Sequence, residues 1–154
     1  MPIDDHISDA DREMLRSILR KDNDRLEAAV EGAETQCVFR MNWEGGGTEI
    51  TRYTTPVGKH YFRRSGGGVD IDENDDEVWN HYEGDLVSSF EEVLFFLGFG
   101  KEILCLRPSV VHPDYRDRMR EYIDKLLKEV ISDDRRRLGN RLAKTADQWF
   151  ERLK

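Results

Sequence analysis

The chain has 154 residues, of which 38% are hydrophobic and 36% are charged, and its formal net charge is −8. This length suits one hydrophobic core, and we expect residues 1–154 to form a single domain. The negative charge argues against general binding of DNA or RNA, which needs a positively charged surface. The longest apolar run, "VLFFLGFG" at 93–100, is too short to cross a bilayer, so neither nucleic acid nor a membrane is an expected partner.

The first residues, "MPIDDHISDADRE", are acidic and lack the apolar segment of a secretory signal. Only two cysteines occur, Cys37 and Cys105. We therefore expect a reducing, cytoplasmic setting in which both thiols are free.

A helix is predicted near the start of the sequence. Ser8 followed by Asp11 resembles a capping box, and Gly32 marks a natural stop. Between them, apolar residues recur at the spacing of one helix face. These residues are Leu15, Ile18, Leu19, Leu26, Ala29 and Val30. The pattern indicates an amphipathic helix with an acidic outer face.

Three strands are predicted next. Apolar and polar residues alternate in "TQCVFRMNW" at 35–43, which is typical of a half-buried strand. "TEITRYTT" at 48–55 and "HYFRRS" at 60–65 follow across glycine-containing turns, and "VDI" at 69–71 is a candidate fourth strand after a turn at Gly66–Gly68. These connections are too short for parallel crossovers, so they predict an antiparallel meander.

The second half of the chain is predicted to be mainly helical. Ser89 and Glu92 predict a capping box for a short apolar helix that ends at Gly98, and "EILCLRP" at 102–108 predicts an edge strand ended by Pro108. Asp114 is the expected cap of a helix over 115–131, and a last helix begins at about residue 134. The predicted class is α+β, with an N-terminal helix, a small antiparallel meander and about three C-terminal helices packed on the sheet.

The most unusual segment is "VDIDENDDEVWNHYEGD" at 69–85. Residues 70–92 hold ten acids and no base, whereas residues 135–154 carry a net charge of +5. Asp70, Asp72 and Asn74 match the first ligand positions of an EF-hand loop, but Asp75 and His81 stand where that loop needs glycine and glutamate. The four histidines are scattered and the two cysteines are not paired, so we predict no metal site.

Two other interpretations of this segment remain open. Rigidly held carboxylates attract a basic partner, and neighbouring aromatic side chains supply anchors for binding. Alternatively, the segment is a solvated connection with Trp79 packed into the core. The first interpretation predicts the following partner-binding residues: Asp70, Asp72, Asp75, Asp76, Glu77, Trp79 and Tyr82.

No motif in the sequence indicates catalysis or a cofactor, and we predict neither. Cys105 lies among apolar residues, which is typical of an inert buried thiol, and "RRSGGG" at 63–68 does not continue as a phosphate-binding loop. An enzyme whose site is assembled from distant residues would draw on His60, Tyr61, Arg63 and His112.

The function that these observations favour is that of a small acidic intracellular binding module, which masks a basic surface of a partner protein. An inhibitor or an immunity-type protein acts in this way. The alternatives are a structural adaptor that forms a homo-oligomer through a sheet edge or the basic segment at 133–144, and the small enzyme described above.

Overall fold

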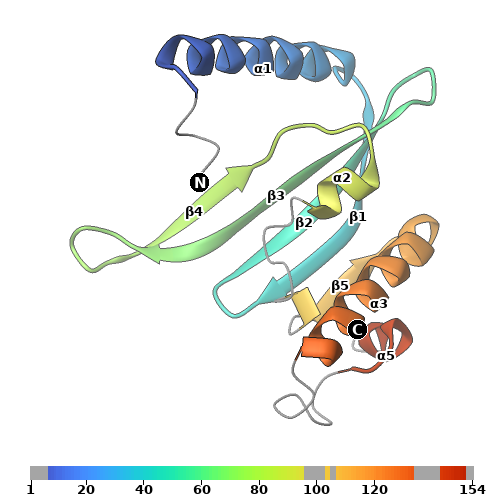
Figure 1. Cartoon of the computed structure of the whole chain (residues 1–154). Coiled ribbons are helices and arrows are strands. Elements are labelled where there is room, and N and C mark those ends of the chain that lie inside the picture. Colours follow the sequence, from blue (N-terminus) through green and yellow to red (C-terminus); the bar gives the residue numbers. More distant parts are fainter. Residues whose placement is uncertain (1–6, 96–102, 105–106, 134–142, 152–154) are drawn as a thin grey trace.

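The computed structural model describes residues 7–95, 103–104, 107–133 and 143–151. A long helix is followed by two β-hairpins, a short helix, a fifth strand and two further helices (Figure 1). The elements are α1 (Asp9–Ala29), β1 (Glu34–Trp43), β2 (Gly46–Thr54), β3 (His60–Ile71), β4 (Glu77–Glu83), α2 (Phe90–Phe95), β5 (Arg107–Val111), the 3-10 turn η3 (Pro113–Tyr115), α3 (Arg116–Asp133) and α5 (Ala146–Phe150). The predicted α+β class is confirmed.

All five strands join one antiparallel sheet in the order β4-β3-β2-β1-β5. The first four strands form the predicted meander, and β5 adds to its far edge beside β1. The register places Glu49 opposite both Arg40 and Ser65, and Trp79 opposite Val69. Residues that share a face can therefore be followed across the sheet.

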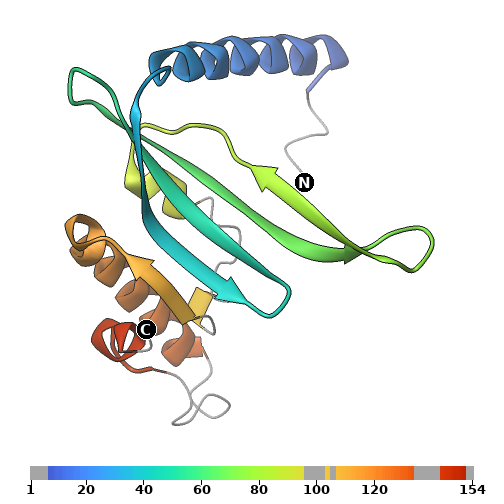
Figure 2. The same ribbon diagram turned by 180° about the vertical axis from the view of Figure 1, so that it is seen from behind.

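One face of the sheet forms the hydrophobic core. Phe39, Met41, Ile50 and Phe62 point to this core face and are buried. Helices α2, α3 and α5 lie on that side, and the view from behind shows β1 and β2 without a helix in front of them (Figures 1 and 2). None of the described helices is long and apolar enough to cross a membrane.

Helix α1 starts as predicted, because the Ser8 hydroxyl accepts a hydrogen bond from the Asp11 amide. At its other end, Leu26 and Val30 pack with Tyr61 and Leu86. No residue between Asp9 and Ala29 is buried, and the apolar stripe of its middle turns is open to solvent. The exposed fractions are 65% for Met14, 51% for Leu15, 57% for Ile18 and 59% for Leu19. Among the described residues, the apolar packing of this amphipathic helix on the sheet is thus at its last turns.

The structure differs from the predicted strand limits around the glycine triplet. Strand β3 continues through Gly66–Gly68 to Ile71, and β4 forms within the acidic segment. The sequence predicts a turn at these glycines, but in the structure Gly66 and Gly67 make room for aromatic side chains of β4 that lie across them. The turn between the strands is instead at 72–76.

Two limits in the second half also differ. The strand predicted at 102–108 is β5 at Arg107–Val111, with Pro108 inside the strand at the sheet edge, where a missing amide is tolerated. His112 rather than Asp114 caps the turn that leads into α3, because its ring Nδ1 accepts from the Asp114 amide. The Ser89 cap is confirmed, since its hydroxyl accepts from the Glu92 amide. Gly98, Cys105 and the predicted start of the last helix lie outside the described residues.

Candidate functional site

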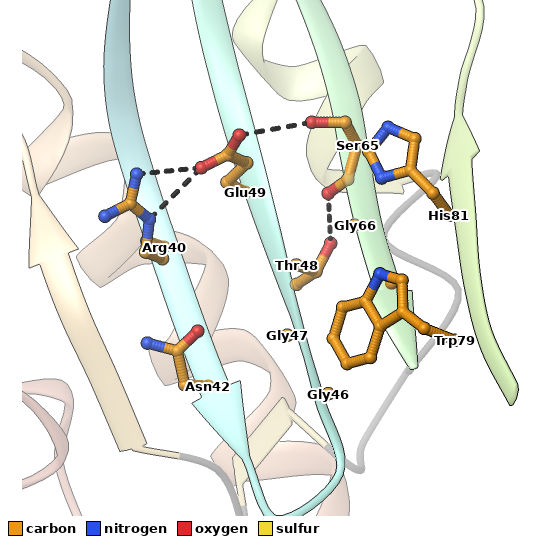
Figure 3. A pocket seen from close by; sticks show the side chains of 11 residues that line it. Arg40, Asn42, Gly46, Gly47, Thr48, Glu49, Ser65, Gly66, Trp79 and His81 are labelled. Atoms are coloured by element: carbon orange, nitrogen blue, oxygen red, sulfur yellow. Dashed lines mark hydrogen bonds and ion pairs between the residues drawn. The ribbon is translucent and has the colours of Figure 1, made fainter. Parts of the chain in front are cut away.

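The sheet face opposite the core, here called the open face, carries a row of polar side chains. Arg40, Glu49 and Ser65 lie side by side on β1, β2 and β3 (Figure 3). The Arg40 guanidinium donates to Glu49 Oε2 at 2.9 and 3.1 Å, and the Ser65 hydroxyl donates to Glu49 Oε1 at 3.4 Å. These bonds fix the middle of the open face and neutralise its charge locally.

A shallow hollow of about 250 Å³ lies beside this row. Trp79 and His81 of β4 border it on one side, and Arg40 and Asn42 of β1 border it on the other (Figure 3). Its floor is made by glycines of β2 and β3, namely Gly46, Gly47, Gly66 and Gly67. The floor is backbone rather than side chain, so the hollow can receive an extended chain or a flat group.

Glycine is needed at Gly67 because Trp79 lies over it. A Cβ atom at Gly67 would stand 2.6 Å from Trp79 Cζ2 and 2.8 Å from Cε2. On the core face, a Cβ at Gly66 would meet the Tyr82 hydroxyl oxygen at 2.7 Å. An aromatic side chain that covers a strand glycine compensates for the missing side chain of that glycine. Trp79 is thus held across β3 and still has 62% of its surface exposed.

The acidic residues Asp70–Glu77 form the tip of the β3–β4 hairpin, here called the acidic hairpin. Asp72 organises the turn: its Oδ1 accepts from the amides of Asn74 and Asp76, at 2.8 and 3.0 Å. Asp75 has a φ of 60°, a left-handed conformation that Asp and Asn adopt more readily than most residues. Asp70 accepts from the Ile71 amide and from the Asn80 side chain. These bonds give the turn a defined conformation.

The remaining carboxylates of the hairpin point into solvent. Glu73, Asp75, Asp76 and Glu77 are exposed, and in the described part of the chain their carboxylates take part in no ion pair or hydrogen bond. Within the described part of the chain, the protein's own arginines therefore do not neutralise these four carboxylates. Arg63, for example, pairs with Glu27 and with Glu83 instead.

The predicted partner-binding residues are brought together only in part. Glu77 and Trp79 point to the open face, next to the exposed side chains of Val69 and Ile71, which are 47% and 65% accessible. Tyr82 points to the core face, where Arg64 stacks over its ring at 5.1 Å and its hydroxyl donates to Thr48. Asp70 and Asp72 serve the hairpin backbone, whereas Asp75, Asp76 and Glu77 are the predicted acids that remain available.

The four residues of the enzyme alternative do not form a cluster. Tyr61 is buried on the open-face side against α1, and Arg63 stacks on Tyr53 at 5.4 Å. His60 bonds to Thr54 on the outside of the β2–β3 hairpin, whereas His112 lies against Tyr115 at the start of α3. Among the described residues, no group of three or more His, Cys, Asp or Glu side chains is placed to hold a metal ion.

Cys37 lies at the edge of the open face, with its Sγ 4.0 Å from Glu49 Oε2. Burial raises the pKa of this thiol above its ordinary value, and the Arg40 guanidinium offsets part of the rise. The pKa of Tyr53 is raised as well, by burial and then by the charges of Glu83 and Glu49. A thiol of raised pKa is a poor nucleophile near neutral pH, so Cys37 has no sign of activation.

Sequence reasoning missed the open face itself. The alternation in 35–43 already puts Arg40 and Asn42 on the side away from Phe39 and Met41. The sequence did not indicate that residues 66–68 and 77–83 form strands. The hollow depends on these two strand segments. No family model matches the chain, and no curated protein or solved structure matches it.

Proposed function

We propose that this protein is a binding module that captures a basic partner protein through the acidic hairpin and the adjoining open face. The single observation that carries this proposal is that four carboxylates without an ion-pair partner among the described residues lie near an exposed indole that is held against the sheet. Trp79 is 62% exposed although its ring is held over Gly67. An aromatic side chain that is already ordered loses little conformational entropy on binding, which makes it a good anchor.

The charge distribution supports a basic partner. The exposed acids at the hairpin tip add to a chain of net charge −8, which speeds the encounter with a positive surface and repels a negative one. The hairpin also extends past β2, because the Val69 amide bonds to the Gly45 carbonyl of the β1–β2 turn and the residues beyond it, Asp70 and Ile71, pair with β4 alone. Masking of a partner's basic surface, as in an inhibitor or an immunity-type protein, is the biological role that these features fit.

The experiment compares capture of partners from cell extract by three immobilised proteins. The first is the wild type, and the second carries Glu73→Gln, Asp75→Asn, Asp76→Asn and Glu77→Gln. The third is a control with the same change in net charge, made by Asp24→Asn, Glu31→Gln, Glu121→Gln and Glu129→Gln at exposed positions away from the hairpin. A partner that this site holds is captured by the wild type and the control, and is lost from the hairpin variant and from Trp79→Ala.

Salt dependence provides the second readout. Raising NaCl from about 0.1 M to about 1 M shortens the screening length from about 10 Å to about 3 Å and should release the partner. Capture that is equal in the hairpin variant and the control would contradict the proposal.

The exposed stripe of α1 favours a second candidate, an adaptor that self-associates through this helix. Leu19 and Leu26 also line a groove of about 380 Å³ next to Leu86, Val87 and Val93. A sedimentation experiment tests this candidate. It is supported if the mass of the wild type rises with concentration and the Leu15→Glu/Ile18→Glu variant stays a monomer. A monomer at all concentrations would remove it.

A further inference from the structure

The outer edge of β4 is an unpaired strand edge. Strand β4 ends the sheet, and among the described residues no other strand pairs with its outer side. Every residue from Glu77 to Glu83 is exposed except Val78, which is half-buried. The opposite edge strand, β5, is short and contains Pro108, two features that protect an edge against pairing. Strand β4 contains no proline.

The backbone groups that face outward can be assigned from the hydrogen-bond pattern. In an antiparallel pair, facing residues alternate between bonded and non-bonded pairs. The bonds Gly84 N to Arg64 O and Asp72 N to Asp76 O fix this alternation at both ends of β4. Val78, Asn80 and Tyr82 therefore bond to β3, whereas the amides and carbonyls of Glu77, Trp79, His81 and Glu83 point away from the sheet.

The same four residues place their side chains on the open face. A strand that pairs with this edge would put alternate side chains within about 5 Å of Glu77, Trp79, His81 and Glu83. Two of these positions are acidic and one is the exposed indole; Glu77 has no ion pair among the described residues, and the exposed Glu83 carboxylate lies 3.9 Å from Arg63. Lys or Arg at the ends of the incoming strand and an apolar residue opposite Trp79 complement this row.

A second copy of the chain is a poor occupant of this edge. In the antiparallel register centred on Asn80, Glu77 of one copy faces Glu83 of the other, and like charges opposite one another destabilise a strand pair. The charges that oppose self-pairing are the ones that favour a basic strand.

We propose that the partner binds by strand addition: an extended basic segment pairs with the outer edge of β4 and lays alternate side chains beside Glu77, Trp79, His81 and Glu83. This inference rests on the proposed function, because it specifies how the same surface holds its basic partner. Main-chain hydrogen bonds would supply affinity, and the acid–indole–acid row would supply specificity.

The test uses a synthetic heptapeptide, Arg-Thr-Ile-Thr-Val-Thr-Arg with blocked ends, as the probe, and the same peptide with glutamate at both ends as the control. Binding is measured by calorimetry in about 0.05 M NaCl. The decisive variant is His81→Pro, since proline removes an outward amide and leaves the bonds to β3 in place. His81→Ala is its matched control, because it removes the side chain and keeps the amide.

Strand addition predicts that the basic peptide binds wild type and His81→Ala alike, and His81→Pro at least about tenfold more weakly. The acidic peptide should not bind. Equal binding to both His81 variants, or no binding at peptide concentrations of about 1 mM, would overturn the inference.

Two further measurements separate this inference from the proposed function. If the hairpin variant still binds the basic peptide undiminished while His81→Pro does not, strand addition stands and the role of charge fails. If the hairpin variant loses binding and the His81 variants do not differ, charge capture stands and strand addition fails. Should His81→Pro unfold, wild type is titrated with two peptides, one N-methylated at the odd positions and the other at the even positions. Only the peptide whose methylated amides face β4 should lose binding. Equal affinities would overturn the inference.

Discussion

A glycine-to-alanine substitution at residue 67 tests whether Trp79 is held against the sheet. The added Cβ would stand 2.6 Å from Trp79 Cζ2, so the indole must move off β3. Gly68, the next residue, offers a matched control. Its Cβ would meet only the Gly45 carbonyl oxygen, at 3.6 Å, which is an ordinary contact. Neither glycine has a positive φ, so backbone strain does not enter the comparison.

The expected magnitude follows from the covered part of the indole. With 62% of Trp79 exposed, a little more than a third of a side-chain surface of about 250 Å² is covered, which is about 90 Å². At about 25 cal/mol per Å² this contact is worth about 2 kcal/mol. Replacing a strand glycine by alanine returns about 0.5–1 kcal/mol through the unfolded state. We therefore expect Gly67→Ala to lower the free energy of unfolding by about 1 kcal/mol and Gly68→Ala to raise it slightly.

Urea unfolding followed by circular dichroism measures both changes. A double-mutant cycle with Trp79→Ala isolates the contact. In the Trp79→Ala background the cost of Gly67→Ala should shrink, although the Asn80 carbonyl at 2.9 Å from the added Cβ leaves part of it. Equal effects of Gly67→Ala and Gly68→Ala in the wild-type background would refute the claim that the indole is packed on the strand.

Three further predictions concern the charge of the acidic hairpin, the exposed middle turns of α1 and the Cys37 thiol. Neutralising Glu73, Asp75, Asp76 and Glu77 should raise the free energy of unfolding by a few tenths of a kcal/mol at low salt, because like charges no longer repel, and the gain should vanish at about 1 M NaCl in a parallel denaturation series. A gain that persists at high salt would argue against repulsion. Leu15→Gln/Ile18→Gln should change the free energy of unfolding of the monomer by no more than about 0.5 kcal/mol, since these side chains are 51% and 57% exposed. Leu26→Ala should lower it clearly more, because Leu26 packs against the sheet. Comparable losses would show that the middle of α1 is packed. In the folded protein Cys37 should react more slowly with iodoacetamide at pH 8 than it does in the unfolded chain, because its raised pKa keeps the thiol protonated. The reaction rate should rise only at a pH above the ordinary thiol pKa. Peptide mapping by mass spectrometry measures the labelling, and fast labelling at pH 8 would contradict this prediction.

Local sequence signals were sufficient for most of the fold. The Ser8 and Ser89 caps mark the starts of α1 and α2, and the alternation around Phe39 and Met41 identifies β1 and its buried face. Both signals act within a few residues, so they do not depend on how the chain folds at longer range. The antiparallel order of β1 to β3 followed from short connections for the same reason.

The glycine triplet and strand β4 could not be read in this way. Gly66–Gly68 is a strand only because Trp79 and Tyr82 lie across two of its glycines, one on each face. That stabilisation comes from residues more than ten positions later in the chain and overrides the local tendency of glycine to end a strand. The strand pattern of residues 77–83 was also hidden. One set, Glu77, Trp79, His81 and Glu83, contains the large apolar Trp79, and the other, Val78, Asn80 and Tyr82, contains a polar Asn80, so no clear apolar face stands out.

The candidate site was predicted in the same partial way. The absence of bases in 70–92 indicates an acidic surface segment, and the sequence predicts Trp79 and Tyr82 as anchors. The different roles of the acids were not visible in the sequence. The carboxylates of Asp70 and Asp72 accept hydrogen bonds within the hairpin, from backbone amides and from the Asn80 side chain, and these bonds depend on the folded turn. The opposite orientation of Trp79 and Tyr82 depends on the strand register, which the sequence did not show.

Hydrogen exchange at individual β4 amides tests the central claim most directly. In the protein alone, the outward amides of Trp79, His81 and Glu83 should exchange rapidly, whereas those of Val78, Asn80 and Tyr82 should be protected by β3. On saturation with the basic heptapeptide, the outward set should gain protection and the inward set should stay unchanged. If the peptide binds and the outward amides of β4 still exchange as they do in its absence, the partner does not add a strand at this edge.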